Sequence, residues 1–246
     1  MAKRTRLDAA LVSRNLVSSR ARGQALIMAR RIRVNGEVVD KAGAPVSDED
    51  EIGITELDHP WVGRGGIKLD QALRHFEIDV EGLVCADIGS STGGFTDVLL
   101  SGGALRVFAI DVGYGQLDQK LREDPRVVVM ERTNARYLEP EDIDPFDFAS
   151  IDVSFISLEM ILPVAVRLSR PSFHLVALIK PQFEAGRENI GKGGIVREQS
   201  VRDEVVERIA AFTRSQGMEV IGVIESPIRG AEGNVEYLMY AKRFAE

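Results

Sequence analysis

The decisive stretch of this 246-residue chain reads VCADIGSSTGGF and spans residues 84–95. A short apolar run ends at Asp87, glycines and small hydroxyl residues follow, and an apolar pattern with helical spacing begins at Phe95. Glycines let the backbone take positive φ in a tight turn and approach a ligand closely. The pattern therefore predicts a buried strand, a tight loop and a helix N-terminus. Such a unit opens a nucleotide-type α/β domain, in which ligands bind beyond the strand ends.

The glycine spacing of this loop distinguishes between cofactors. A dinucleotide site needs G-x-G-x-x-G, whereas this loop reads Gly89-x-x-x-Gly93-Gly94, with Asp87 shortly before it. Such spacing suits S-adenosylmethionine, which carries no phosphate and whose amino and carboxylate groups sit against the loop. An ordinary strand–turn–helix junction is the alternative. The candidate cofactor-binding residues of the stretch are Asp87, Gly89, Ser90, Ser91, Gly93, Gly94 and Phe95.

Strand and helix signals alternate after the loop, which predicts a mostly parallel sheet with helices on both faces. Loop 226–234 is too short for a helical crossover, so the last strand is expected to run antiparallel. We therefore predict an α/β fold with the Rossmann-like class I methyltransferase sheet of seven strands, one of them antiparallel and near the edge. The later strands are expected at 106–111, 126–130, 146–152, 174–180, 219–225 and 235–242. The helices are expected at 94–100, 117–123, 156–168 and 199–215.

Composition narrows the class of protein. The single cysteine, Cys85, excludes a disulfide within the chain and is expected to be a buried hydrophobic residue. The three histidines, His59, His75 and His174, lack ligand spacing, so no metal site is expected. The N-terminus lacks the apolar region of a signal peptide, and the longest apolar stretch, 160–179, is too polar to span a bilayer. We expect a cytoplasmic monomer with no membrane contact.

Charge is distributed unevenly along the chain. The net charge is −7, yet residues 1–41 hold ten Lys/Arg against three acidic residues. That segment therefore carries +7 and the remainder −14. This asymmetry favours a basic module that docks on a polyanion, joined to an acidic, enzyme-like body. A solvated basic surface without a partner is the alternative.

The basic module is expected to hold two short helices and a hairpin turning at Asn35-Gly36. The order Arg6-Leu7-Asp8-x-x-Leu11, Ser18-Ser19-Arg20, Leu26-Ile27 and Ile32-Arg33-Val34-Asn35-Gly36 resembles the S4 RNA-binding domain. The resemblance implies that the second helix and its adjoining loop contact RNA phosphates, which position a protein without specifying sequence. The candidate RNA-binding residues are Arg4, Arg6, Arg20, Arg22, Arg30, Arg31 and Arg33.

A segment rich in glycine follows this module. Residues 59–66 contain a proline, the only tryptophan and three glycines, which indicates either a plain connector or a turn that contacts a ligand. An amphipathic helix comes next, with Lys68 near its start, where the helix dipole disfavours a cation. We therefore expect an S4-like domain at 1–58, a linker at 59–66 and a methyltransferase domain at 67–246.

Polar residues recur where the expected strands end. Asp111 lies 22 positions past Gly89, near the offset at which an acid binds ribose hydroxyls. Asn134 follows the next strand, where it either reaches an adenine edge or forms only an Asx turn. Both positions agree with a cofactor that contains adenosine.

Three charged residues flank the later strands. Asp152 ends the fourth strand without the D/N-P-P-Y/F turn of amino-methyltransferases, and no cysteine is placed for cytosine-C5 chemistry, so an oxygen acceptor is favoured. Lys180 follows an apolar run and Glu236 lies early in the last strand, where a charge is costly unless it is paired or used. Lysines held near carboxylates can position a weakly acidic ribose hydroxyl and offset its developing negative charge. Two structural ion pairs are the alternative.

Motifs along the whole chain resemble the TlyA-type ribosomal-RNA methyltransferases, which join an S4 domain to an FtsJ-like methyltransferase domain. The resemblance implies 2′-O-methylation of cytidine in ribosomal RNA, with S-adenosylmethionine as donor. It places the family's catalytic set on Lys68, Asp152, Lys180 and Glu236. The motifs are residues 62–66 with Lys68, then 87–95, 109–116, 131–136, 152–158, 180–184 and 233–237.

Three further expectations follow from this resemblance. Relatives that modify both ribosomal subunits carry extra residues beyond the last strand, so a chain ending at Glu246 resembles the type that acts on the large subunit alone. A catalytically inactive RNA-binding or ribosome-associated factor is the second hypothesis, and the intact set of four charged residues argues against it. Membrane lysis, suggested by the hemolysin label of some relatives, is not expected, because no spanning or lytic helix is evident.

Overall fold

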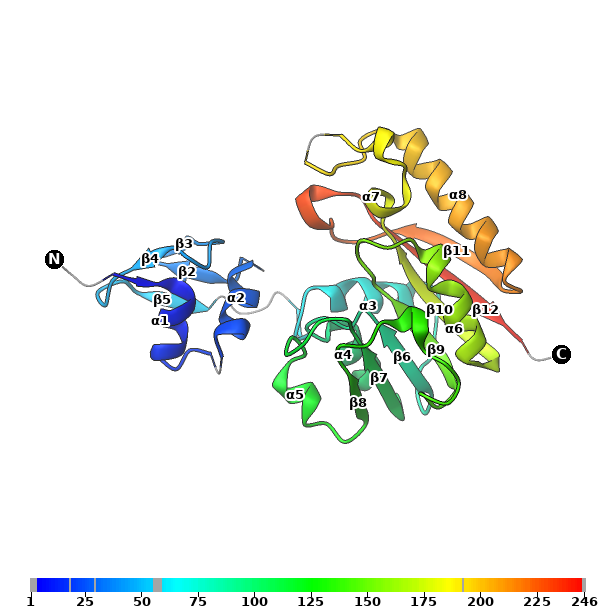
Figure 1. Cartoon of the computed structure of the whole chain (residues 1–246), viewed down its shortest axis with the longest axis horizontal. Helices are drawn as coiled ribbons and strands as arrows, with labels where there is room; N and C mark the ends of the chain where they lie inside the picture. Colours follow the sequence, from blue (N-terminus) through cyan, green and yellow to red (C-terminus); the bar gives the residue numbers. More distant parts are fainter. Residues whose placement is uncertain (1–3, 18, 29, 55–58, 192, 245–246) are drawn as a thin grey trace. The chain divides into compact units, whose positions relative to one another are not determined.

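The computed structural model describes residues 4–17, 19–28, 30–54, 59–191 and 193–244 (Figure 1). The chain divides into two compact units, Met1–Pro60 and Trp61–Glu246. Most of the segment expected as a linker lies in the second unit, where Trp61 packs directly on Gly66 and the Val62 amide donates to Asp97. Ser18, expected beside a helix start, and residues 55–58, at the expected domain boundary, lie outside the described residues.

The first unit packs two helices, α1 (Leu7–Ser13) and α2 (Arg20–Met28), with short antiparallel strands. Asn35 and Gly36 turn the chain with φ of 52° and 85°, the positive values of a two-residue hairpin turn, which confirms the predicted hairpin. Leu7, Leu11 and Ile27 are fully buried at its core. Strands β2 (Ile32–Val34), β3 (Glu37–Val38) and β5 (Ile52–Ile54) form one sheet, and β1 (Thr5–Arg6) pairs with β4 (Pro45–Val46).

The second unit is built on a seven-stranded sheet in the order β11-β12-β10-β9-β6-β7-β8. Strand β12 runs antiparallel to both of its neighbours and lies next to the edge strand, which confirms the predicted sheet. Its neighbour β10 and the strands beyond it pair in parallel. The strands are β6 (Val84–Ile88), β7 (Arg106–Ile110), β8 (Val127–Met130), β9 (Phe146–Ile151), β10 (Ser169–Ile179), β11 (Glu219–Glu225) and β12 (Tyr237–Arg243).

Helices cover both faces of this sheet, as predicted. Side chains alternate along the strands: Val107 and Ala109 pack with helices α3, α4 and α5, while Phe108 and Ile110 pack with α6 and α8. The helices are α3 (Gly65–His75), α4 (Gly94–Ser101), α5 (Gln119–Arg122), α6 (Leu162–Leu168), α7 (Pro181–Glu184) and α8 (Gln199–Ser215). Single 3₁₀ turns lie at η1 (Ala135–Tyr137), η2 (Leu158–Met160), η3 (Arg187–Asn189) and η4 (Ala231–Gly233).

The predicted helix 156–168 and strand 174–180 differ most from the structure. Helix α6 begins only at Leu162, because Pro163 suits the first turn of a helix and the residues before η2 form an irregular loop. Strand β10 begins earlier than expected, at Ser169, and its pairing with β9 is interrupted between Ser169 and His174, where Pro171 lies.

Two properties of single elements bear on function. Cys85 is buried in β6, as predicted, and burial raises the pKa of its thiol, which disfavours the nucleophilic thiolate. Among the helices that the structure describes, none has the length and apolar character needed to cross a membrane.

Candidate active site

The loop between β6 and α4 approaches its neighbours so closely that its glycines are required. Gly89 has φ of 89°, and a Cβ there would lie 2.4 Å from the carbonyl oxygen of Asp152. The amides of Gly89 and Ser90 both donate to the Ile110 carbonyl at the end of β7. The loop therefore lies directly over the carboxyl ends of β6, β7 and β9, where the sequence predicts a ligand.

Asp111 fixes the outer turn of this loop. Its Oδ2 accepts from the Ser91 amide at 2.8 Å, and its Oδ1 accepts from the Gly113 amide at 2.6 Å. Ser91 is held at a positive φ of 48°, so this contact stabilises an uncommon backbone conformation. Each carboxylate oxygen keeps a further lone pair, which leaves Asp111 able to accept from ribose hydroxyls.

Asp87 is completely buried beneath the loop. It accepts from Thr96 Oγ1 at 2.6 Å and from Ser150 Oγ at 3.3 Å. Burial raises the pKa of this carboxyl group to about 7, against the opposing effect of these hydrogen bonds. Asp87 thus ties the loop to α4 and β9 from below and does not line the pocket above it.

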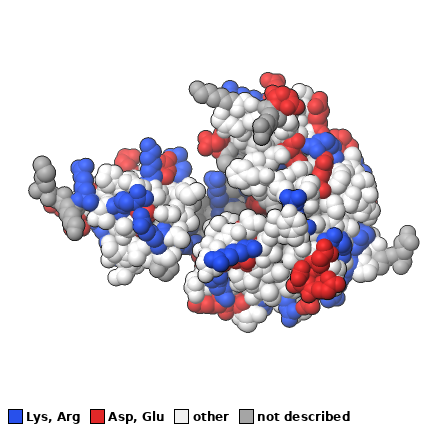
Figure 2. Space-filling model, in the orientation of Figure 1, with Lys and Arg blue, Asp and Glu red and all other residues white. Residues whose placement is uncertain are grey.

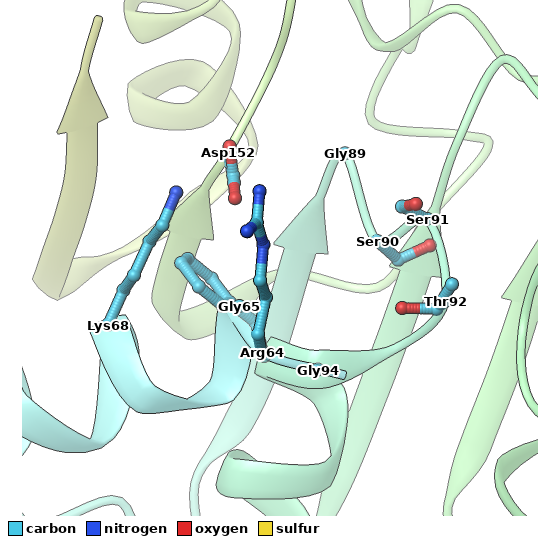
Figure 3. Close-up of a pocket in the computed structure, with 10 residues that line it drawn as sticks. Arg64, Gly65, Lys68, Gly89, Ser90, Ser91, Thr92, Gly94 and Asp152 are labelled. Carbon is cyan, nitrogen blue, oxygen red and sulfur yellow. The ribbon is translucent and has the colours of Figure 1, made fainter. Parts of the chain in front are cut away.

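A pocket opens above the loop and contains many of the predicted site residues (Figure 3). Two of them, Lys68 and Asp152, belong to the predicted catalytic set, and the others are the loop residues Gly89, Ser90, Ser91, Gly94 and Phe95. Arg64, Gly65 and Thr92 also line it and were not predicted individually. Gly93, Asp111 and Asn134 do not line this pocket. The Asn134 side chain accepts from the Arg136 amide at 3.1 Å, which is the local turn that the sequence left as its alternative.

Lys180 and Asp152 form the first of two ion pairs at this edge of the sheet. Their Nζ and Oδ1 atoms are 2.5 Å apart, and Lys180 also donates to Ser154 Oγ at 3.0 Å. The side chains are 9% and 20% exposed. The pair is therefore reachable from the pocket yet shielded enough for its charges to interact strongly.

Lys68 and Glu236 form the second pair, with 2.6 Å between Nζ and Oε2 and both side chains buried. Glu236 immediately precedes β12, and because β12 is antiparallel its start lies beside the end of β10, where Ile179 pairs with Tyr237. A third residue, Gln182, donates from Nε2 to Glu236 Oε1 at 3.0 Å. The structure thus brings the four predicted catalytic residues to one edge of the sheet, in two pairs.

The loop after Asp152 presents an exposed aromatic residue that sequence reasoning missed. Phe155 is 90% exposed and has φ of 64°, which is strained for an aromatic residue. The ring centres of Phe155 and Phe183 are 4.8 Å apart, and Lys180 Nζ lies 5.8 Å from the Phe183 ring centre. One sequence feature could have identified Phe155: it lies between Ser154 and the next predicted helix and belongs to no apolar pattern.

Glu184 anchors the same loop from α7. It accepts from Ser157 Oγ and from the Leu158 amide, each at 2.7 Å. Burial raises the pKa of this carboxyl group. The strained Phe155 is thus held in place by hydrogen bonds on its C-terminal side and by the Lys180–Asp152 pair on the other.

In the first unit, four of the seven predicted RNA-binding arginines differ in the contacts they make. Arg6 and Arg20 both donate to the fully buried Asp8, and these contacts lower the pKa of Asp8 far below its usual range. Arg33 donates to the carbonyl of the turn residue Gly36, and Arg30 lies 3.7 Å from Asp40. Figure 2 shows blue side chains, with red ones beside them, on the visible face of this unit.

Within the described residues, no group of three or more His, Cys, Asp or Glu side chains is arranged to hold a metal ion. The donor set fits S-adenosylmethionine instead. A glycine loop allows close approach, Asp111 suits ribose hydroxyls, and the paired charges lie where a methyl acceptor would be placed.

Comparisons with known proteins bear on both units. A model of the FtsJ-like methyltransferases matches residues 61–243, and an S4 domain model matches residues 5–52. YqxC of Bacillus subtilis, named as an rRNA methyltransferase, is 47% identical over 97% of this chain and 85% of its own length. A Mycobacterium tuberculosis protein named 16S/23S rRNA (cytidine-2′-O)-methyltransferase TlyA is 46% identical over 98% of this chain and 91% of its own. A solved structure from Streptococcus thermophilus that carries a hemolysin name has a TM-score of 0.78 at 44% identity, covering 99% of this chain and 90% of that one.

Proposed function

This chain belongs to the FtsJ-like methyltransferase family and carries an S4 domain ahead of it, and from that premise we propose its reaction and substrate. The protein is an S-adenosylmethionine-dependent methyltransferase that acts on the 2′-hydroxyl of a cytidine in ribosomal RNA. The observation that carries the proposal is the pair of Lys–carboxylate contacts, Lys180–Asp152 and Lys68–Glu236, beside a glycine-loop pocket.

The residues that would hold the cofactor come from three elements. The loop residues Gly89–Thr92 and Gly94 would cradle its methionine end, and Asp111 would accept from its ribose. When bound, S-adenosylmethionine supplies an electrophilic methyl group to an acceptor placed beside the two ion pairs.

The two ion pairs act on the acceptor oxygen. A ribose 2′-hydroxyl is a very weak acid, so its attack needs proton removal or stabilisation of negative charge. We assign this role to Lys180, because its Nζ pairs with the pocket residue Asp152 and lies beside the loop that bears Phe155. Asp152 orients the Lys180 ammonium, and the Lys68–Glu236 pair completes the network beside the acceptor.

The RNA is held in two places. Phe155 and Phe183 would offer an exposed stacking surface for an unstacked target base, since sequence-specific RNA recognition often stacks bases on aromatic side chains. The arginines of the S4 domain would bind phosphates and so position the molecule on its substrate.

The test is to incubate the purified protein with labelled S-adenosylmethionine and isolated 30S or 50S subunits, and then to digest the RNA to nucleosides. We expect label in 2′-O-methylcytidine. Label on a base, or in no nucleoside, contradicts the proposal. Lys180→Ala should lose about 10²- to 10⁴-fold in rate while still binding S-adenosylmethionine, and an inactive RNA-binding factor would show no methylation to lose.

The same experiment decides the narrower proposal that only the large subunit is modified. Label in 50S RNA alone supports it, and label in both subunits contradicts it. Because the M. tuberculosis relative is named for both 16S and 23S rRNA, the two arms are run side by side.

A further inference from the structure

Arg64 brings an uncompensated positive charge into the pocket. Figure 3 shows its side chain pointing toward Asp152, across from the glycine loop. Within the described part of the chain, the Arg64 side chain makes no hydrogen bond or ion pair. The two other charged residues of the pocket, Lys68 and Asp152, are each neutralised by a partner outside it. Among the described residues that line the pocket, Arg64 is therefore the cation left to face a ligand.

The backbone that carries Arg64 is packed against the cofactor loop. A Cβ on Gly94 would lie 2.8 Å from the Gly66 amide nitrogen and 3.1 Å from the Gly63 carbonyl oxygen. A Cβ on Gly63 would lie 2.6 Å from Thr92 Oγ1. Arg64 itself precedes α3 with φ of −61° and ψ of −19°, already in the helical region. Its side chain thus starts from a fixed point beside the loop.

The order of the strands decides which part of the cofactor lies near Arg64. Strand β6 lies between β7, which leads into Asp111, and β9, which leads into Asp152. With the ribose at Asp111, the sulfonium lies toward Asp152 if the methyl group is to meet the acceptor. The amino-acid end of the cofactor would then lie between the glycine loop and Arg64, which line the same pocket.

We propose that Arg64 binds the α-carboxylate of the methionine moiety of S-adenosylmethionine. The inference rests on the proposed function, because it assigns a further binding residue within the same site. The carboxylate is the cofactor's single anionic group, and a guanidinium can bind it through two parallel N–H donors. A phosphate of the substrate RNA is the competing anion, and the experiment separates the two.

The test compares two ligands that differ only in this carboxylate, S-adenosylmethionine and decarboxylated S-adenosylmethionine, titrated calorimetrically into the full chain. For Arg64→Gln we expect the dissociation constant for S-adenosylmethionine to rise about 10- to 100-fold, since a charge-assisted hydrogen bond is lost. Binding of the decarboxylated ligand should be unchanged or tighter, because the variant removes a cation that repels it. Arg74→Gln, on the helix that Arg64 precedes and with a 77% exposed side chain, is the matched control and should bind both ligands as the native chain does.

Each other outcome contradicts the assignment. Equal weakening of both ligands means that Arg64 supports the pocket without contacting the carboxylate. Unchanged binding of both, together with weaker binding of ribosomal RNA, means that Arg64 binds a phosphate. Failure of the native chain to bind S-adenosylmethionine contradicts the proposed function itself, whereas tight binding by Arg64→Gln contradicts only the role of Arg64.

Discussion

Gln182 donates a hydrogen bond of 3.0 Å to Glu236, and it binds the carboxylate oxygen that Lys68 leaves free. All three side chains are buried. Gly230 closes the remaining side, since a Cβ there would lie 2.0 Å from Glu236 Oε1. The Glu236 carboxylate is thus fixed from three directions, and Gln182 positions it for Lys68 without reaching the pocket itself.

Replacing Gln182 should therefore lower turnover while leaving substrate binding largely intact. For Gln182→Met, which keeps the size of the side chain but not its donor, we expect kcat for RNA methylation to fall about 10- to 100-fold with little change in KM, the range for a lost hydrogen bond to a charged group. Gln119→Met, an exposed substitution on α5, should have no effect.

In the variant Gln182→Glu, the positioning of Glu236, and with it the methylation activity, should depend on pH. The introduced carboxyl group can donate to Glu236 only when it is protonated, and it repels Glu236 once it is ionised. The activity of this variant relative to the native chain should therefore be highest at the lowest pH and fall as pH rises. A ratio that stays constant with pH contradicts the positioning role and leaves Gln182 a packing residue.

Replacement of Phe155 should lower activity while leaving stability nearly unchanged. Phe155→Gly relieves a positive φ that glycine adopts freely and gives up only one contact between rings, so we expect the free energy of unfolding to change by less than about 1 kcal/mol. Loss of a stacking surface for the target base should lower kcat/KM for RNA about 5- to 100-fold. Denaturant titration and methylation kinetics measure the two effects.

Phe244→Ala is the control for this experiment. Phe244 is also an exposed aromatic residue, but it follows the end of β12, whereas the site lies at the start of that strand. It should leave methylation unchanged. Equal losses in the two variants would show that exposed aromatic surface in general, and not Phe155, governs activity.

Substitutions of the S4 arginines should fall into two classes. Some should weaken RNA binding without changing stability, and others should weaken RNA binding and also lower Tm. Arg33→Gln should weaken RNA binding and reduce the slope of log K against log salt concentration by about 0.7–0.9, with Tm unchanged. Arg6→Gln should weaken RNA binding and also lower the Tm of the first unit, because Asp8 loses two hydrogen bonds. If both variants keep the native salt slope, neither arginine contacts phosphate.

The fold followed from the sequence because its signals are local. The glycine spacing at 89–94, the alternation of strands and helices and the short loop before the last strand each constrain only a few neighbouring residues. Together they predict a mostly parallel sheet with one antiparallel strand near its edge. The bounds of α6 and β10 did not follow, since they depend on Pro163 and Pro171 and on how the loop after Asp152 packs on Glu184.

The site was predictable only where a residue's position in the chain implied its position in the fold. Lys180 and Asp152 end neighbouring strands, so their proximity could be expected. Gln182 and Arg64 could not be singled out in this way. The role of Gln182 depends on a carboxylate from a distant strand, and that of Arg64 on a free charge that appears only once the other charges have been paired.

The buried Asp87 should make the free energy of unfolding depend on pH, and the substitution Asp87→Asn should remove this contribution. Its folded-state pKa is raised to about 7, whereas the unfolded value is near 3.8, so the folded chain holds a proton that the unfolded chain has lost. The associated stability is fully present below the unfolded pKa and is lost as pH rises toward 7. The amide introduced by Asp87→Asn is neutral throughout, so the free energy of unfolding of this variant minus that of the native chain should rise with pH, by up to roughly 4 kcal/mol between pH 4 and 7. Fluorescence of Trp61, the only tryptophan, reports unfolding of the second unit in denaturant. A difference between the two proteins that stays constant over this range would mean that Asp87 is ionised in the folded chain.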